Sequence, residues 1–261
     1  MCKLKSAIIL KDRIFMPDYD SHSKMLDELG ITDDYFNASK VFVRAELSPA
    51  DGNVFSDIDG WKFYVDQDIT PEWFDEKDCA ERMRKAVKEW AKTHIFVGRN
   101  ELKISHGENI IIKDCKNVDI CGSATVKNIC GDATVESIYD SATVENIYDS
   151  ATVESICDSA TVKNIYGNTM VKNIYGNATV KNICGDATVE SIYGNATVKY
   201  ICGGATVENI YDSATVISSP YTKWSNSASL IIADNATFKD CYSKTIYQAG
   251  GWEFVKVTRG K

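Results

Sequence analysis

Three histidines occur in this sequence, and one of them stands in a cluster that could bind a metal. His22 closes the segment Pro17-Asp18-Tyr19-Asp20-Ser21-His22, which also carries two carboxylates. Carboxylate oxygens and imidazole nitrogens are common ligands of divalent metals in proteins. A loop that leads into a capped helix explains the same residues, because Ser and Asp are favoured helix caps. We therefore predict no metal or cofactor site from this segment.

Other catalytic signatures are weak. The triplets Asp57-Ile58-Asp59 and Asp66-Gln67-Asp68 could supply an acid and a base, but such triplets are more typical of turns. The sequence contains no phosphate-binding Walker A loop, no GxGxxG and no GxSxG motif. No nucleophile–base pair is visible either. The expected protein is not an enzyme, and an enzyme with its site within residues 1–104 is kept as an alternative.

Charge and cysteine content restrict the class of protein. The net charge of −8 and the pI near 5.0 argue against a general nucleic-acid binder. No apolar stretch is long enough to span a bilayer, and no N-terminal segment has the form of a signal peptide. A cytoplasmic protein is expected, so all nine cysteines, including Cys184 and Cys202, are expected to be reduced. None of the nine forms a CxxC pair, which gives no support to a zinc site.

A nine-residue repeat occupies the middle of the chain. Ala, Val and Ile each recur at intervals of nine residues between 124 and 216, and Thr169 stands where one Ala is missing. Ala-x-Val alternates with the period of a strand, and the recurring Gly-Asn, Gly-Asp and Asp-Ser dipeptides favour turns. Each unit is predicted to be a short strand and a bend. Because one unit cannot bury its apolar side alone, the units must stack.

Alternate units carry different polar residues, which indicates that two units form one coil. The charged position reads Lys127, Glu145, Lys163, Lys181 and Lys199 in one set of units, and Glu136, Glu154, Lys172, Glu190 and Glu208 in the other. Nine residues are too few to close around a packed interior, whereas 18 are enough. The sequence predicts a two-sided β-solenoid that rises by about 4.8 Å per coil. One sheet should be mostly basic and the other mostly acidic.

The acidic side of this solenoid is the predicted interaction face. Tyrosines follow the repeated Ile in several of the same units, and Tyr is enriched at protein interfaces. The face comprises Glu136, Glu154, Glu190, Glu208, Tyr139, Tyr175, Tyr193 and Tyr211. It would attract a basic protein partner. Solvated surface charges and simple ladder packing of the tyrosines explain the same pattern, and association of the acidic side with the basic side of another copy is a further alternative.

Both ends of the repeat array need caps, because an exposed strand edge can pair with another chain. Residues 109–115 and 235–241 look like degenerate units, and Trp224 is predicted to plug the apolar end. The expected domains are a small α/β domain at 1–104, the β-solenoid at 105–243 and a capping hairpin at 244–261. In the first domain we expect strands within 7–16, 41–47 and 61–65 and helices at 21–29 and 78–93.

Three N-terminal segments, 5–12, 61–68 and 89–92, resemble a module in uncharacterised proteins of gut bacteria and their phages. Such proteins carry similar repeat tails, in which Asn, Asp or Ser precedes Ala-Thr-Val. The resemblance extends over nearly the whole chain and implies a phage or mobile-element setting. It implies no activity.

The predicted fold is an α+β N-terminal domain followed by a β-solenoid. The predicted function is that of a non-enzymatic scaffold that binds another protein, and in a phage setting the partner would be a host defence protein. A self-assembling structural protein, forming homo-oligomers, is the second alternative beside an enzyme. No membrane is expected as a partner, and nucleic acid is not favoured.

Overall fold

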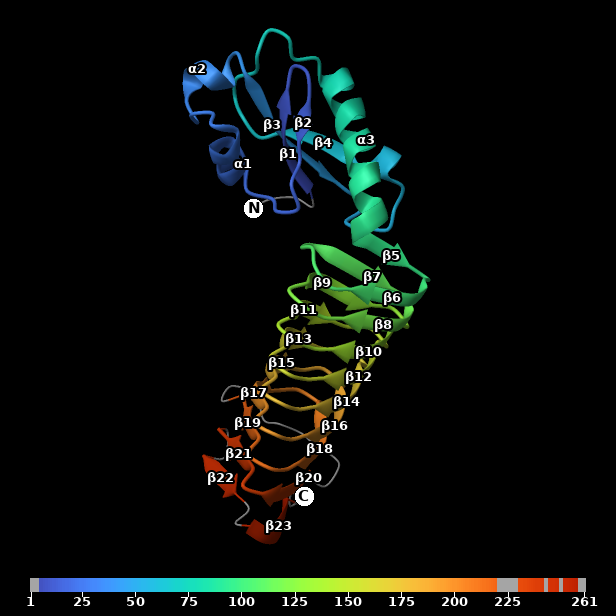
Figure 1. Cartoon of the computed structure of the whole chain (residues 1–261), viewed down its shortest axis with the longest axis vertical. Coiled ribbons are helices and arrows are strands. Elements are labelled where there is room, and N and C mark those ends of the chain that lie inside the picture. The colour runs from blue at the N-terminus through green and yellow to red at the C-terminus, as the bar shows by residue number, and fades with distance from the viewer. Residues whose placement is uncertain (1–4, 220–229, 242–243, 249–250, 258–261) are drawn as a thin grey trace. The chain divides into compact units, whose positions relative to one another are not determined.

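The computed structural model describes residues 5–219, 230–241, 244–248 and 251–257; for 230 and 251–257 only the backbone is described. The chain divides into two compact units, Met1–Ile95 and Phe96–Lys261. Figure 1 shows helices and a small sheet in the first unit, and stacked strands in the second. Among the described helices, none combines the length and the apolar character that crossing a membrane requires.

A four-stranded antiparallel sheet of order β2-β1-β3-β4 forms the centre of the first unit. Its strands are β1 (Lys5–Leu10), β2 (Ile14–Phe15), β3 (Phe42–Ser48) and β4 (Lys62–Val65). Successive side chains of a strand point to opposite faces. In β1, Ala7 and Ile9 therefore pack with helix α3 (Glu76–His94), whereas Ile8 packs with helix α1 (His22–Leu29). The sheet is thus covered by a helix on each face.

The helix ends follow from capping residues. The Ser21 hydroxyl accepts a hydrogen bond from the Lys24 amide at the start of α1, and Gly30 ends that helix with a φ of 66°. Asp75 caps α3 in the same way. Two short helices complete the unit, α2 (Tyr35–Ala38) and the 3-10 helix η1 (Ile58–Gly60). The helices and strands predicted for this region are confirmed, because hydrophobic period and caps agree locally.

Two sheets build the second unit. The nine-stranded sheet contains β6 (Asn100–Ile104), β8 (Lys116–Ile120), β10 (Thr134–Ile138), β12 (Thr152–Ile156), β14 (Met170–Ile174), β16 (Thr188–Ile192), β18 (Thr206–Ile210), β20 (Leu230–Asp234) and β23 (Gly251–Val257). The ten-stranded sheet contains β5 (Ile95–Val97), β7 (Ile110–Lys113), β9 (Thr125–Cys130), β11 (Thr143–Ile147), β13 (Thr161–Ile165), β15 (Thr179–Ile183), β17 (Thr197–Ile201), β19 (Thr215–Ser218), β21 (Thr237–Asp240) and β22 (Thr245–Gln248). Consecutive repeat strands therefore alternate between the sheets.

Neighbouring coils pair in parallel and in register. In the nine-stranded sheet, Thr134 pairs with Thr152 and Val135 with Val153, so a residue meets its equivalent one coil away. The ten-stranded sheet repeats this register along β9, β11, β13 and β15. These pairings confirm the predicted β-solenoid with two nine-residue units per coil.

The repeated Ala, Val and Ile residues fill the solenoid interior. The repeated Val residues from 126 to 216 and the repeated Ile residues from 129 to 210 have no exposed surface. Burial of one such side chain contributes about 1.5–3 kcal/mol. Thr169, which replaces Ala in one unit, is also fully buried, and its hydroxyl donates to the Tyr166 carbonyl oxygen at 2.8 Å. The hydroxyl therefore keeps a partner inside an apolar column.

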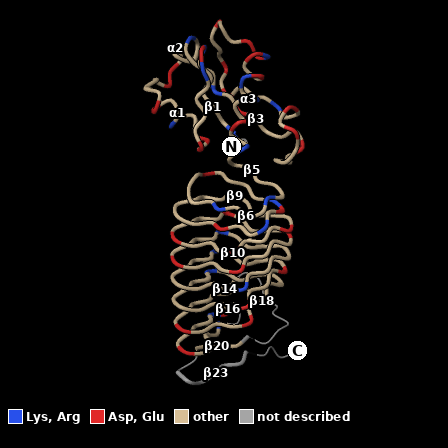
Figure 2. Tube along the Cα trace, turned by 45° about the vertical axis from the view of Figure 1, so that its right-hand side comes forward, with Lys and Arg blue, Asp and Glu red and all other residues tan. Residues whose placement is uncertain are grey.

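The residue that follows the repeated Tyr or Cys is Gly or Asp throughout, because the turn requires a positive φ at this position. Gly185 and Gly194 adopt φ values of 71° and 68°, and Asp140 and Asp149 adopt 56° and 61° at equivalent positions. Gly and, less often, Asp tolerate this conformation. Each Asp also stabilises the stack, since the Asp140 carboxylate accepts from the Gly122 amide one coil earlier at 3.0 Å. Figure 2 shows acidic residues recurring along the coil edges.

The C-terminal strands differ from the predicted hairpin. Instead of pairing with each other, β22 pairs antiparallel with β21 and β23 pairs antiparallel with β20. The reason is that a two-sided coil presents two strand edges, one in each sheet, and each edge receives its own strand. Antiparallel pairing ends the parallel stacking in both sheets. The predicted plug, Trp224, lies outside the described residues.

The packed interior makes core and surface substitutions unequal. Ile165→Ala should lower the free energy of unfolding by about 2–5 kcal/mol, because it leaves a cavity in a column with no exposed surface. The exposed Lys181→Ala change should alter it by less than about 0.5 kcal/mol. Urea titration followed by circular dichroism measures both values. Equal effects of the two substitutions would contradict the packed interior.

Candidate functional site

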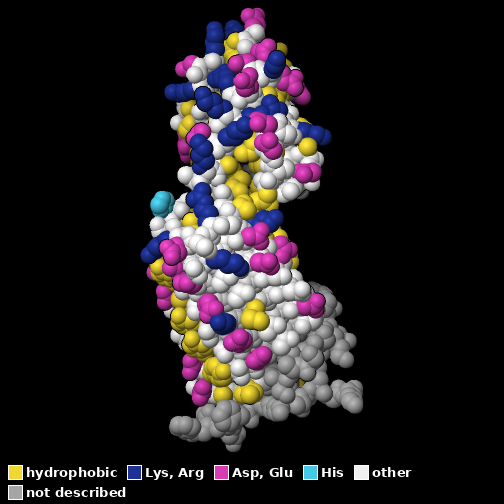
Figure 3. Space-filling model, turned by 90° about the vertical axis from the view of Figure 1, so that its right-hand side faces the viewer, with side chains coloured by type: hydrophobic (Ala, Val, Ile, Leu, Met, Phe, Trp, Pro, Cys, Tyr) yellow, Lys and Arg dark blue, Asp and Glu magenta, His cyan; other side chains and the backbone are white. Residues whose placement is uncertain are grey.

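The four predicted glutamates of the interaction face lie on one sheet. They belong to β10 and β12 on one side of β14 and to β16 and β18 on its other side, all in the nine-stranded sheet. Glu136 and Glu208 are exposed, whereas Glu154 and Glu190 are half-buried. The predicted interaction face is called the acidic face from here on, and it comprises Glu136, Glu154, Glu190, Glu208, Tyr139, Tyr175, Tyr193 and Tyr211. Figure 3 shows one side of the solenoid, on which charged side chains are scattered rather than gathered in one patch.

One lysine interrupts the glutamate column. Lys172 in β14 lies between Glu154 and Glu190, and its Nζ donates to Glu154 Oε1 at 2.6 Å. The hydrogen bond with Glu154 raises the pKa of the Lys172 ammonium. Like charges on directly adjacent strands repel each other, so a lysine in the middle relieves the column. Lys172 forms this ion pair with Glu154 alone among the glutamates of the face. The other three are Glu136, Glu190 and Glu208.

The tyrosines of the face fall into two groups. Tyr175 and Tyr193 stack with ring centroids 5.0 Å apart and an angle of 2° between planes, and Tyr211 continues the column in a tilted arrangement at 6.3 Å. Tyr139 is separated from this column because Cys157 occupies the intervening coil. Stacked aromatic pairs of this kind contribute about 0.5–1.5 kcal/mol beyond burial. Figure 3 shows hydrophobic side chains gathered along one edge of the solenoid.

Neighbouring groups favour the neutral phenol at these positions. A hydrogen bond with the Cys157 thiol is the main cause that raises the pKa of Tyr175, whereas burial is the main cause at Tyr193. A hydrogen bond with Cys121 raises the pKa of Tyr139. The acidic face therefore offers phenol hydroxyls and ring surface, and its negative charge comes from the carboxylates.

The opposite edge carries a disulfide that the sequence analysis did not expect. Cys184 and Cys202 are joined, with their Cα atoms 4.8 Å apart. The expectation that these two cysteines are reduced is wrong for this structure. The in-register coils place equivalent residues at a separation within the usual range for disulfides, about 4.4–6.8 Å. On the same edge, Tyr148 and Tyr166 stack at 5.3 Å between centroids.

Sequence reasoning missed the extension of the acidic face towards the start of the solenoid. Strands β6 and β8 continue the nine-stranded sheet, and with Glu136 of β10 they line a hollow of about 320 Å³ that includes Lys103 and Asp119. Interaction with Tyr139 raises the pKa of the Lys103 ammonium. The nine-residue period could not reveal these residues, because Leu102 pairs with Val118, which is not 18 residues away.

The cluster considered at the sequence level, Asp18, Asp20 and His22, does not converge. Asp18 Oδ1 lies 2.9 Å from Nε2 of His94. Asp20 accepts from the fully buried Lys5 amine at 3.2 Å. The His22 ring instead contacts the Asp66 carboxylate and the Ala45 carbonyl oxygen. The loop therefore distributes its polar groups among separate partners, as expected of a structural loop.

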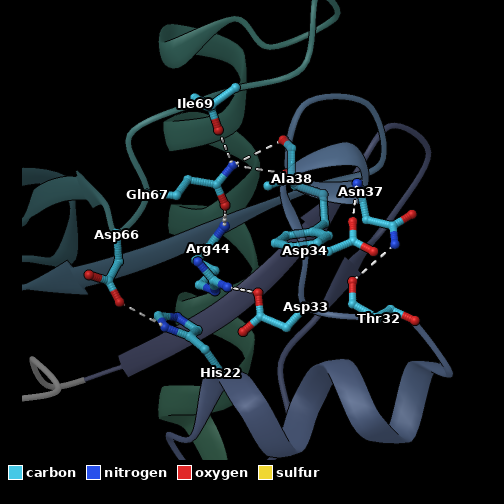
Figure 4. Close-up of polar contacts among 11 residues, drawn as sticks. His22, Thr32, Asp33, Asp34, Asn37, Ala38, Arg44, Asp66, Gln67 and Ile69 are labelled. Atoms are coloured by element: carbon cyan, nitrogen blue, oxygen red, sulfur yellow. Dashed lines mark hydrogen bonds and ion pairs between the residues drawn. The ribbon is translucent and has the colours of Figure 1, made fainter.

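A cleft of about 480 Å³ lies beside α2 and the ends of β3 and β4. Its lining includes four aspartates and a single arginine: Asp33, Asp34, Asp66, Asp68 and Arg44. The Arg44 guanidinium forms an ion pair with Asp33, as Figure 4 shows. The remaining carboxylates give the cleft a negative field, which favours cationic ligands.

Gln67 holds the wall of this cleft together. Its side-chain oxygen accepts from the Arg44 amide at 2.8 Å, and its nitrogen donates to the carbonyl oxygens of Phe42 and Ile69 at 3.1 and 2.6 Å. Figure 4 shows these contacts beside the His22–Asp66 pair. The triplet Asp66-Gln67-Asp68 thus forms a bend after β4, and both of its carboxylates line the cleft.

No known family, curated protein or solved structure matches the chain. The geometry of the acidic face and of the cleft is therefore the basis for any functional conclusion.

The raised tyrosine pKa values predict a loss of stability at alkaline pH. Above about pH 10, the ordinary tyrosine value, the unfolded chain loses phenol protons that the folded chain keeps. The free energy of unfolding should therefore be unaffected by these groups below that pH and should fall as the pH rises further. Urea titrations across this range, with phenolate absorbance recorded in parallel, measure the slope. Tyr193→Phe should make the slope shallower, because it removes one phenol whose pKa is raised by burial. Identical slopes for the wild-type protein and this variant would contradict the assignment.

Proposed function

We propose that the chain is a non-enzymatic scaffold that binds a basic protein partner through the acidic face. The observation that carries this proposal is the in-register stacking of β10 to β18, which repeats glutamate and tyrosine positions on one rigid surface. Such a surface is preorganised, so little conformational freedom is lost when a partner binds.

The packed interior favours the outer surface as the functional part of the solenoid. Its Val and Ile columns are fully buried and fill the space between the two sheets. A substrate cannot enter an interior packed at the density of a protein core without displacing these side chains. Recognition must then use side chains that point outward from the coils.

The chemistry of the face indicates the type of partner. Exposed carboxylates steer basic surfaces during association, and tyrosines add contact area with few rotatable bonds. Lysine- or arginine-rich segments also interact favourably with aromatic faces. A partner with basic residues spaced along an extended segment would match the repeat best, and the setting implied by the resemblance makes this partner a host defence protein.

Neutralising the glutamates of the acidic face should weaken binding of the partner. We expect a Glu136→Gln/Glu190→Gln/Glu208→Gln variant to lose a protein that the wild-type chain retains in affinity capture from host lysate, with retention reduced at least about 10-fold. Glu154 is left intact because it pairs with Lys172. Glutamine keeps the side-chain shape and avoids stacking new positive charges.

The matched control neutralises the opposite sheet. Lys127→Gln/Lys181→Gln/Lys199→Gln changes the same number of charges on β9, β15 and β17 and should leave retention unchanged. Retention of the same proteins by both variants would contradict the proposal. Light scattering of each protein separates the alternative of self-assembly, in which a mass above 29.0 kDa would fall to the monomer value in both variants.

A further inference from the structure

His22, Glu46 and Asp66 converge in the first unit although they are distant in the sequence. One possible ligand atom from each lies within 4.8 Å of the other two. His22 is the first residue of α1, Glu46 belongs to β3, and Asp66 directly follows β4. The Asp66 amide donates to the Arg44 carbonyl oxygen at 2.9 Å, which fixes this end of β4 beside β3. Three separate elements of the fold therefore position the cluster.

The contacts of the His22 ring determine which nitrogen is available to a ligand. Nε2 lies 3.2 Å from the Ala45 carbonyl oxygen, which can only accept, so Nε2 must carry a hydrogen. In the neutral ring, Nδ1 then holds a lone pair and faces Asp66 Oδ2 at 3.2 Å. Two acceptors that face each other repel unless a cation or a proton lies between them. Figure 4 shows the ring directed at Asp66.

Glu46 adds an unusual carboxylate to this cluster. The residue is only 7% exposed, and its carboxylate makes no hydrogen bond or ion pair with the residues that the structure describes. A carboxylate that is largely shielded from water and has no donor beside it is costly, because little of its lost hydration is replaced. A cation at the cluster would satisfy Glu46 together with Nδ1 of His22.

The cluster opens towards the acidic cleft. The Asp66 side chain is 62% exposed and lines the cleft together with Asp33, Asp34 and Asp68. Arg44 is the cation of the cleft lining, and its guanidinium is engaged by Asp33. The field at the cleft therefore attracts cations, and solvent reaches the cluster from the side of Asp66.

We propose that His22, Glu46 and Asp66 form a binding site for a divalent transition metal such as Zn²⁺ or Mn²⁺. Nδ1 of His22 and one oxygen from each carboxylate are the ligands, and water from the cleft completes the coordination. The hydrogen bond from Nε2 to Ala45 orients the ring, an arrangement that metal-binding histidines commonly show. Imidazole as a ligand favours Zn²⁺ over Mg²⁺ and Ca²⁺, which prefer oxygen, and the two carboxylates also suit Mn²⁺.

The spacing of the ligand atoms fits this proposal after a small adjustment. Ligand atoms about 2.0–2.2 Å from one metal ion lie roughly 3–4 Å from each other. The observed separations of up to 4.8 Å require the carboxylates to close in slightly. His22 Nδ1 and Asp66 Oδ2 are already 3.2 Å apart, so the closing movement falls mainly on the Glu46 side chain.

Isothermal titration of the full chain with Zn²⁺ and with Mn²⁺ tests the site. The wild-type protein should bind one equivalent that Glu46→Gln and His22→Gln bind at least about 10-fold more weakly. Asp34→Asn removes a carboxylate from the same cleft without touching the cluster and should bind within about 3-fold of wild type. Circular dichroism of each variant confirms that it is folded.

Thermal unfolding supplies a second readout. The metal should raise the melting temperature of the wild-type chain and of Asp34→Asn, and it should raise that of the two ligand variants less, because only binding to the folded state stabilises. Absence of a stoichiometric metal site in the wild-type protein would overturn the proposal and leave only the contact between His22 and Asp66. Equal binding by wild type, Glu46→Gln and His22→Gln would overturn it as well, since the metal would then lie elsewhere, for example at cysteine thiols.

Discussion

Parallel, in-register pairing of coils 18 residues apart is the interaction on which the rest of the solenoid depends. Through the regular coils it places Val on Val and Ile on Ile, so that one short unit without a core of its own contributes to a continuous buried column. The same pairing carries the backbone hydrogen bonds across the turns, as from the Tyr148 amide to the Ile129 carbonyl oxygen at 3.0 Å. Stability is therefore distributed along the stack.

In-register pairing also determines what the surface can be. Any residue that points outward meets a copy or a close equivalent of itself about 4.8 Å away. Asparagines tolerate this well, because an amide both donates and accepts, and Asn146, Asn164 and Asn182 form a ladder of side-chain hydrogen bonds. Charges tolerate it poorly, which explains the sign changes at Lys172 in one sheet and Glu145 in the other. Glu145 pairs with Lys163 at 2.7 Å. Tyrosines gain stacking from the same geometry.

The repeat made the solenoid predictable, whereas its ends and the first unit were only partly so. A period of nine residues fixes which side chains point inward and how many residues a coil needs, and the sheet register follows from these two facts. The C-terminal strands were mispredicted because a hairpin and two separate edge strands share the same local pattern. The disulfide between Cys184 and Cys202 was visible as a stacked pair, but the inferred compartment argued against it. The prediction thus failed on redox chemistry and succeeded on geometry.

The cluster in the first unit shows a different limit of sequence reasoning. His22 was singled out with Asp18 and Asp20, its neighbours in the chain, yet the fold directs it towards Glu46 and Asp66. The alternation of β3 can predict that Glu46 points to the face of the sheet opposite α3. No local sequence pattern predicts which helix begins beside Glu46 on that face. Such convergence is a property of tertiary packing and becomes visible only with coordinates.

Cysteine pairs introduced by mutation would test the central claim most directly. Thr143 and Thr161 are partners on adjacent strands of one sheet, whereas Thr143 and Thr152 belong to different sheets. After mild oxidation of the folded protein and peptide mapping, we expect a disulfide in Thr143→Cys/Thr161→Cys and none between the introduced residues in Thr143→Cys/Thr152→Cys. A link across nine residues in place of 18 would show that the coils do not stack as described.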